Sequence, residues 1–165
     1  MLQKLKYYLK EILLFTIILL VFANALSIYK SFDLNKQNLS LRKITLLHNN
    51  EYVQNDTKPL LVHFWATWCP TCRVEAPNIQ YLSKYYEVLT IAVKSGSDKE
   101  IQVWMDENKY DFNVVNDSSS LIASNYKIGV FPTSLIYDKN KSLVFSDVGY
   151  TSTWGLFLRM WWATL

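Results

Sequence analysis

Hydrophobic residues form an unbroken run near the N-terminus, where 18 uncharged residues separate Glu11 from Lys30. As a helix, this run would be about 27 Å long at 1.5 Å per residue, just enough for the hydrocarbon core of a bilayer. No polar face interrupts it, so a buried amphipathic helix is a poor interpretation. The pattern therefore predicts that residues 1–30 form a short cytoplasmic stub followed by a transmembrane helix.

Two details of this segment indicate how it is oriented in the membrane and whether it is cleaved. Lys4, Lys6 and Lys10 precede the run, so the positive-inside rule leaves residues 1–10 in the cytoplasm and exports the C-terminal remainder of the chain. The rival interpretation is a cleaved signal peptide, because Ala23-Asn24-Ala25 has the small-x-small spacing of a cleavage site. The run is long and continues past that site, which favours a retained anchor. In both cases the body of the chain is expected outside the cytoplasm.

The rest of the chain shows shorter patterns, which predict a single α/β domain. Residues 31–38 are polar and are expected to form a linker. Residues 39–59 contain a short alternating piece that indicates a β-hairpin with its turn near His48-Asn49-Asn50. Apolar runs typical of buried strands then alternate with helical segments, in the order β-α-β-α-β-α-β-β-α. This order predicts a mixed sheet.

The predicted strands cover residues 60–66, 88–93, 112–115, 131–137 and 142–148. The predicted helices cover residues 73–86, a segment that begins near 97, a short piece within 118–129, and the aromatic C-terminus from residue 154. Ser97 with Glu100 three residues later forms a capping-box pattern, which supports the second helix.

Composition and charge exclude some classes of protein. Half of the residues are hydrophobic and 15% are aromatic, which allows a sizeable core and does not suggest disorder. The net charge of +3 comes from the first 30 residues, and the remainder holds 13 basic and 13 acidic side chains. Because Lys and Arg form no cluster, nucleic acid is not an expected partner.

The only two cysteines, Cys69 and Cys72, follow the predicted strand 60–66 and open the next helix. A single pair that closes so small a ring adds little stability, so a purely structural disulfide is a poor explanation. Backbone N–H groups at a helix N-terminus lower the pKa of a thiol, and Pro70 suits the first helical position. Spacing and context predict a redox couple in which Cys69 attacks and Cys72 resolves the mixed disulfide.

Metal and haem chemistry fit the cysteine pair less well. A structural zinc site needs four ligands, and only His48 and His63 are available to join the two thiols. Covalent haem attachment needs a histidine directly after the second cysteine, where this chain has Arg73. We therefore expect no metal and no cofactor. A non-enzymatic, thiol-based copper-binding protein remains an alternative.

The segment FWATWCPTC resembles the active-site segment of thioredoxin-fold proteins, in their membrane-tethered, extracytoplasmic TlpA-like branch. Residues 93–138 and the segment GYTSTWGLFLRMWWA are similar to the part of that branch that includes the copper-sensitivity suppressor protein D. The resemblance covers about residues 40–165. It implies a thioredoxin-like domain over residues 39–165, a mixed central sheet flanked by helices, with the hairpin and the anchor as N-terminal additions.

The same resemblance implies a location and an activity. It places the protein in the bacterial inner membrane as a single-pass protein, with the catalytic domain on the periplasmic side and a link to copper tolerance. The activity would be that of a protein disulfide oxidoreductase. Reduction is the expected direction, with protein disulfides as substrates and electrons from a membrane thiol donor of the DsbD kind. A disulfide-forming oxidase on the same fold is the alternative enzyme.

Three supporting residues are carried over from the resemblance. Pro132 matches the position at which the fold has a cis-proline packed against the cysteine pair. Glu75 matches a glutamate that tethered thiol reductases often carry, where it either moves a proton for the thiols or is a solvated first-turn residue. His63 occupies the strand position at which thioredoxin has a buried aspartate. We favour a core histidine without a catalytic role there, with an acid–base role as the alternative.

The residues around the cysteine motif and one residue of the C-terminal helix also have expected positions. Trp68 either shields the thiols or contacts the substrate, whereas Trp65 is expected to pack in the core. Val130 stands where many relatives have glycine, and the bulky Phe131 is expected to narrow the substrate groove. In the C-terminal helix, Arg159 is expected on the solvent side of a helix that covers the core.

Overall fold

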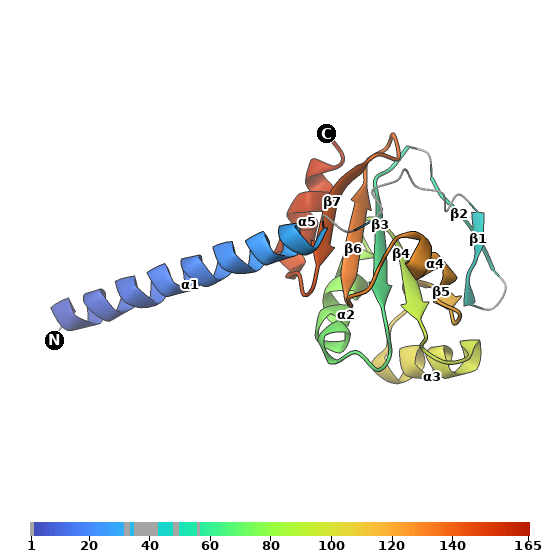
Figure 1. The fold of residues 1–165 in the computed structure, drawn as a ribbon, viewed down its shortest axis with the longest axis horizontal. Coiled ribbons are helices and arrows are strands. Elements are labelled where there is room, and N and C mark those ends of the chain that lie inside the picture. Colours follow the sequence, from blue (N-terminus) through green and yellow to red (C-terminus); the bar gives the residue numbers. More distant parts are fainter. Residues whose placement is uncertain (1, 32–33, 35–42, 48–49, 56) are drawn as a thin grey trace.

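The computed structural model describes every residue except 1, 32–33, 35–42, 48–49 and 56 (Figure 1). A long helix leads to an α/β domain, whose element order after the N-terminal hairpin is the one expected from the sequence. The helices are α1 (Leu2–Ser31), α2 (Pro70–Leu82), α3 (Asp98–Asn108), α4 (Leu121–Asn125) and α5 (Thr153–Trp162). The strands are β1 (Lys43–Thr45), β2 (Glu51–Val53), β3 (Leu60–Trp65), β4 (Glu87–Val93), β5 (Asn113–Asp117), β6 (Thr133–Tyr137) and β7 (Leu143–Val148).

The central sheet has five strands in the order β5-β4-β3-β6-β7. β3, β4 and β5 run parallel, whereas β6 and β7 are antiparallel to their neighbours, so the predicted mixed sheet is confirmed. β3 lies in the middle, and all six of its residues are buried. This explains its continuous apolar run, because a strand covered on both faces has no solvent side that would need polar residues.

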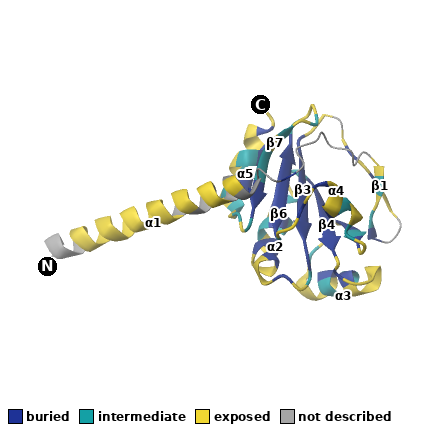
Figure 2. Cartoon of the chain, in the orientation of Figure 1, coloured by how far each residue is buried: buried dark blue, intermediate teal, exposed yellow. Residues whose placement is uncertain are grey.

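Two hydrophobic clusters lie on opposite faces of the sheet, as expected from the alternation of side chains along a strand. Leu61 and Trp65 of β3 join side chains from α2, α3 and α5 in one cluster. Val62 and Phe64 join Tyr126, next to α4, and Tyr52 of the hairpin in the other. Figure 2 shows the result, a buried sheet between layers that are exposed on their outer sides. The helix that carries the cysteines therefore packs on the face of β3 that holds Leu61 and Trp65.

Helix starts follow the local chemistry of the sequence. α2 begins at Pro70, with Cys69 as its N-cap residue, which is three residues earlier than the predicted start. Pro77 lies inside α2 without ending it, and the helix stops at Leu82. α3 has the predicted capping box, in which the Ser97 side chain accepts from the Glu100 N–H and the Glu100 carboxylate accepts from the Ser97 N–H.

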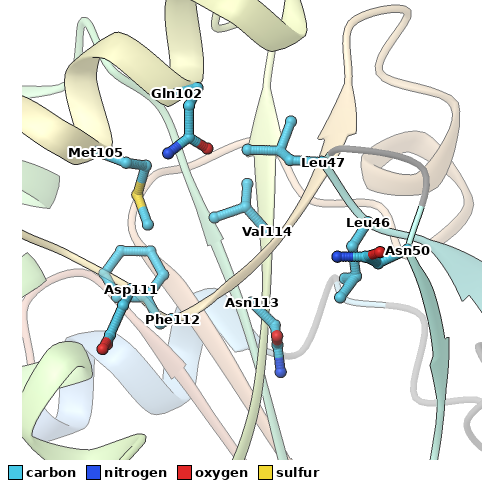
Figure 3. A pocket seen from close by; sticks show the side chains of 9 residues that line it. All are labelled: Leu46, Leu47, Asn50, Gln102, Met105, Asp111, Phe112, Asn113 and Val114. Carbon is cyan, nitrogen blue, oxygen red and sulfur yellow. The ribbon is translucent and has the colours of Figure 1, made fainter.

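The predicted hairpin is present, since β1 pairs with β2 in antiparallel register. Residues 48 and 49 of its expected turn lie outside the described residues, as does most of the expected linker 31–38. Hydrogen bonds from the Tyr52 hydroxyl and the Asn55 N–H to the Glu87 carboxylate tie the hairpin to β4. A cavity of about 230 Å³ lies beside the hairpin (Figure 3). It is lined by Leu46, Leu47, Asn50, Gln102, Met105, Asp111, Phe112, Asn113 and Val114, none of which is a site residue predicted from the sequence.

α1 extends away from the domain, and its C-terminal end comes close to β7 (Figure 1). Large apolar side chains along it, such as Ile12, Phe15 and Val21, are exposed. Among the residues that the structure describes, no helix is both long enough and apolar enough to cross a membrane.

Candidate active site

Cys69 and Cys72 form a disulfide at the N-terminus of α2, directly after the central strand β3. Their Cα atoms are 5.3 Å apart. Cys69 has the extended backbone of an N-cap residue, and its sulfur accepts a hydrogen bond from the Cys72 N–H at 3.2 Å. Cys69 is 5% exposed and Cys72 is 2% exposed. Because the Cys69 sulfur already accepts from the first turn of the helix, the same donor would stabilise a thiolate there.

The loop before the cysteines is held by hydrogen bonds to the residues that directly follow β4. The Trp68 indole N–H donates to the Lys94 carbonyl at 3.0 Å, and the Thr67 N–H donates to the Ser95 hydroxyl at 3.1 Å. Trp68 is nevertheless 56% exposed, and its ring meets the Phe131 ring edge to face at 5.8 Å between centroids. Trp65 is buried and donates to the Thr90 hydroxyl, so its expected packing role is confirmed.

The Trp68–Phe131 pair forms one wall of a cavity of about 370 Å³ next to the cysteine loop. Its lining residues are Trp68, Val93, Lys94, Ser120, Ala123, Ser124, Ile128 and Phe131. Val130 is exposed beside it, and the bulky Phe131 stands at its edge. The aromatic pair therefore joins the cysteine loop to the segment before β6 in the lining of this cavity.

The Phe131–Pro132 peptide bond is cis, as expected from the resemblance. It precedes β6, the antiparallel neighbour of β3. The Pro132 carbonyl accepts a hydrogen bond from the Gly149 N–H at 2.8 Å, which ties this segment to the end of β7. Since Phe131 contacts Trp68, the segment lies against the loop that carries the cysteines.

His63 lies in the middle of β3 and is 2% exposed. Its Nδ1 atom shares a hydrogen bond of 2.9 Å with the Ser134 hydroxyl of β6. Burial lowers the pKa of His63 to about 3, so the ring is neutral at physiological pH. The geometry agrees with a hydrogen-bonded core histidine.

Glu75 is fully buried one turn after Cys72, so it is not the solvated first-turn residue that was one of its two interpretations. One carboxylate oxygen, Oε1, accepts a hydrogen bond of 3.3 Å from the Thr151 N–H. The other, Oε2, is buried with no hydrogen-bond partner among the described residues. Burial raises the pKa of Glu75 to about 8, with a smaller contribution from the negative charge of Asp147. Glu75 is therefore protonated at neutral pH in the disulfide form.

The Asp147–Arg159 ion pair was not predicted from the sequence. Arg159 of α5 was expected on the solvent side, but its side chain is only 24% exposed, and its Nε lies 3.0 Å from Asp147 Oδ2 of β7. The outer side of α5 carries Trp154 and Trp162 instead. The acidic Asp147 in the mostly apolar strand β7 was the feature that could have indicated a buried partner.

No metal cluster is found among the described residues, because they contain no group of three or more His, Cys, Asp or Glu side chains that could hold an ion. His48, one of the two histidines considered above, lies outside those residues. The Nδ1 atom of the other histidine, His63, already shares a hydrogen bond with the Ser134 hydroxyl.

Comparison with known proteins places the chain in a family. Residues 28–146 match the model of the AhpC/TSA family. A thioredoxin-like protein of Haemophilus influenzae is 36% identical over 129 residues, which cover 74% of this chain and 77% of that protein. The thiol-disulfide oxidoreductase ResA of Bacillus cereus is 30% identical over 155 residues, which cover 85% of this chain and 90% of that protein. The chain belongs to the AhpC/TSA family.

Solved structures agree with this assignment at the level of the fold. StoA from Bacillus subtilis superposes with a TM-score of 0.62 at 20% identity, over 69% of this chain and 91% of that one. A secreted Mycobacterium tuberculosis disulfide oxidoreductase gives a TM-score of 0.61 at 21% identity, over 72% of this chain and 92% of that one. The fold is thioredoxin-like, and the protein is a thiol-disulfide oxidoreductase of the thioredoxin-like type.

Proposed function

We propose that this protein reduces protein disulfides outside the cytoplasm through the Cys69–Cys72 couple. The observation that carries the proposal is the disulfide at the N-terminus of α2, in which the Cys69 sulfur accepts a hydrogen bond from the first helical turn. That position favours a thiolate on Cys69 in the reduced protein, and a thiolate is the attacking species in disulfide exchange.

The reaction with substrate has two exchange steps. The Cys69 thiolate attacks one sulfur of a protein disulfide, a bond forms between the two sulfurs, and the other substrate sulfur leaves and takes a proton from water. Cys72 then loses its thiol proton and attacks the Cys69 sulfur. This closes the Cys69–Cys72 disulfide and releases the second substrate sulfur, which is also protonated. Two electrons pass from the cysteines to the substrate.

Glu75 serves as the proton carrier for Cys72. Residues three apart on a helix are neighbours on one face, so Glu75 lies on the same buried face of α2 as Cys72. Its Oε2 atom has no hydrogen-bond partner among the described residues. The Glu75 carboxylate takes the Cys72 proton when the disulfide closes. It returns that proton to the Cys72 sulfur when a donor reduces the disulfide. A pKa of about 8 in the disulfide form suits this role, because the proton is then held at neutral pH.

Reduction is favoured over oxidation by the charges near the couple. Strongly oxidising couples need a highly stabilised reduced form. Here Pro70 and Thr71 lie between the cysteines and carry no charge. Arg73 is exposed, and its Nε donates to the Thr67 carbonyl at 3.0 Å. Little beyond the helix N-terminus therefore stabilises a thiolate on Cys69.

The proposed location is the bacterial inner membrane, with α1 as a single-pass anchor and the domain on the periplasmic side. The uncharged run between Glu11 and Lys30 and the lysines that precede it support this proposal. A membrane thiol donor of the DsbD kind would supply electrons there. The similarity of the GYTSTWG segment to the copper-sensitivity suppressor branch supports a role in copper tolerance.

The division of labour between the two cysteines can be tested by trapping mixed disulfides. Cys72→Ser should accumulate mixed disulfides with reducible proteins through Cys69, visible as adducts on non-reducing gels that disappear with dithiothreitol. Cys69→Ser is the matched control and should form none. Equal trapping by the two variants would show that the assignment of nucleophile and resolving thiol is wrong.

A further inference from the structure

Large apolar side chains gather on the side of α5 that faces away from the core. Four of them, between 50% and 78% exposed, form the outer α5 face: Trp154, Leu158, Trp161 and Trp162. At 3.6 residues per turn, these positions fall within an arc of about 100° around the helix. The opposite side holds Leu156 and Met160, which are fully buried in the cluster shared with α2. The outer α5 face is therefore an apolar stripe left open to solvent.

The outer α5 face carries no charge. The one charged residue of α5 is Arg159, and its guanidinium is paired with Asp147 of β7 at 3.0 Å. A contiguous exposed apolar patch on a soluble domain usually marks an interaction site. Tryptophan is enriched both in protein interfaces and at the boundary between lipid headgroups and acyl chains. The chemistry of the face therefore fits either a protein or a lipid surface.

The end of α1 lies close to the same part of the domain, which favours the lipid surface. α1 contacts β7, and Leu34 is already buried in the cluster that holds Val148 of β7. Only four residues separate Leu34 from Lys30, which ends the uncharged run, so at most about 14 Å of extended chain lies between them. The headgroup region of one leaflet is roughly 5 to 8 Å thick. An anchor that ends at Lys30 therefore holds this end of the domain at the membrane surface.

The direction of α5 suits a helix that lies on a bilayer. Figure 1 shows α5 next to β7, at the side of the domain from which α1 leaves, with its axis running across the direction of α1. A helix that crosses a membrane-spanning helix in this way lies along the bilayer plane, as interfacial helices do. The chain after residue 30 holds equal numbers of basic and acidic side chains. Contact with lipid would therefore depend on apolar burial and not on anionic headgroups.

We propose that the outer α5 face binds the surface of the phospholipid bilayer that α1 enters. The inference rests on the proposed anchor and adds a second point of membrane contact. This contact also orients the helix that carries the cysteines, because α5 and α2 are joined at Asn78. The Asn78 side chain accepts from the Thr153 hydroxyl at 2.8 Å and donates to the Thr151 carbonyl at 3.1 Å. The redox couple is thereby held in one orientation relative to the bilayer and to a membrane thiol donor within it.

Tryptophan fluorescence of the full-length protein in phosphatidylcholine vesicles tests this inference. None of the six tryptophans lies in α1, so the anchor itself gives no signal, and three of the six are on the outer α5 face. Phospholipids brominated on the acyl chains near the headgroup quench a tryptophan that touches them, so wild type should lose emission in brominated vesicles. The triple variant Trp154→Phe, Trp161→Phe and Trp162→Phe keeps the face apolar and should lose this quenching. Trp68→Phe, which removes an exposed tryptophan beside the cysteines, should retain it.

Leu158→Glu tests the contact while all tryptophans are kept. Leu158 is exposed, so the domain should fold, but a charge in the middle of the face raises the cost of burial in the bilayer. This variant should lose most of the quenching by brominated lipid. Val103→Glu is the matched control, because Val103 is also apolar and exposed but lies on α3. It should be quenched as fully as wild type.

Flotation of the vesicles on a density gradient distinguishes failure of this inference from failure of the anchor. Wild-type protein that floats but is not quenched would overturn the inference and leave the anchor intact, and a blue-shifted emission in that case would indicate a second copy on the face. Quenching of Leu158→Glu as full as that of wild type would also overturn it. Protein that does not float would contradict the anchor and the inference together. Disulfide reduction is judged separately by the trapping experiment with Cys72→Ser.

Discussion

Glu75 and His63 are both buried and ionisable. Burial shifts their pKa values in opposite directions, and in both cases the shift favours the neutral side chain. Burial raises the pKa of the Glu75 carboxyl to about 8 and lowers that of the His63 ring to about 3. Both side chains are therefore neutral at pH 7, which is the less costly state for a group removed from water. Of the two, Glu75 has an oxygen without a hydrogen-bond partner among the described residues and a pKa close to the working range.

The stability of the oxidised protein should depend on Glu75 in alkaline solution. Its pKa is higher in the folded state than its ordinary value of 4.5, so the folded state binds more protons between about pH 4.5 and pH 8. Stability should fall as the pH rises through this window. Glu75→Gln should remove that loss and be more stable than wild type at pH 9 by roughly 1 to 3 kcal/mol.

Urea unfolding at pH 5 and pH 9 would measure the difference, with Glu107→Gln as the control. Glu107 is exposed on α3, so its loss should leave the pH dependence as in wild type. If Glu75→Gln kept the full wild-type pH dependence, Glu75 would not hold a proton in the folded disulfide form.

His63 should matter for acid stability and not for catalysis. Its folded-state pKa is below its ordinary value of 6.5, so the stability gained from a neutral ring is complete above pH 6.5 and is lost as the pH falls toward 3. His63→Asn should weaken this acid-induced loss of stability. It should retain disulfide reduction within roughly tenfold at pH 7, because removal of an acid–base group would cost roughly 10²- to 10⁴-fold. A loss in that larger range would identify His63 as a proton carrier.

At the scale of single elements, α2 and the strand before it could be predicted because their sequences are locally consistent. A continuous apolar run gives a fully buried β3, and Pro70 after Cys69 gives a helix start at the cysteine pair. Element ends were less predictable. The predicted helix 73–86 begins three residues too late and ends four residues too late, and α2 continues through Pro77 to Leu82. The packing of α2 on the sheet, which the local sequence does not express, outweighs the cost of the proline.

The proposed anchor makes α1 a separate unit whose behaviour can be measured. Full-length protein expressed in bacteria should stay in the membrane pellet after alkaline carbonate extraction, because an uncharged run of 18 residues resists release. Its Cys69 should react with a membrane-impermeant thiol reagent in intact, dithiothreitol-treated cells with a permeable outer membrane. Release by carbonate would contradict retention as an anchor, and labelling only after lysis would contradict export.

At the scale of the whole molecule, the fold and the position of the redox pair could be predicted from the sequence, whereas the setting of Glu75 could not. The order of strands and helices is encoded in local periodicity. The contacts of Glu75 with Thr151 and of Asp147 with Arg159 depend on how β7 and α5 return to the helix that carries the cysteines. A charged residue such as Arg159 in an aromatic helix suggests a solvent-facing position until its long-range partner is known.

The direction of electron flow depends on the reduction potential of the Cys69–Cys72 couple. Equilibration of the full-length protein in detergent with dithiol and glutathione buffers, followed by thiol alkylation, would give this potential. We expect a value nearer thioredoxin, about −270 mV, than DsbA, about −120 mV, because no cation lies between the cysteines to stabilise the thiolate. The couple should thus be fully disulfide-bonded in an oxidising glutathione mixture. A couple that stays largely reduced in that mixture would contradict a reductase and indicate a disulfide-forming oxidase.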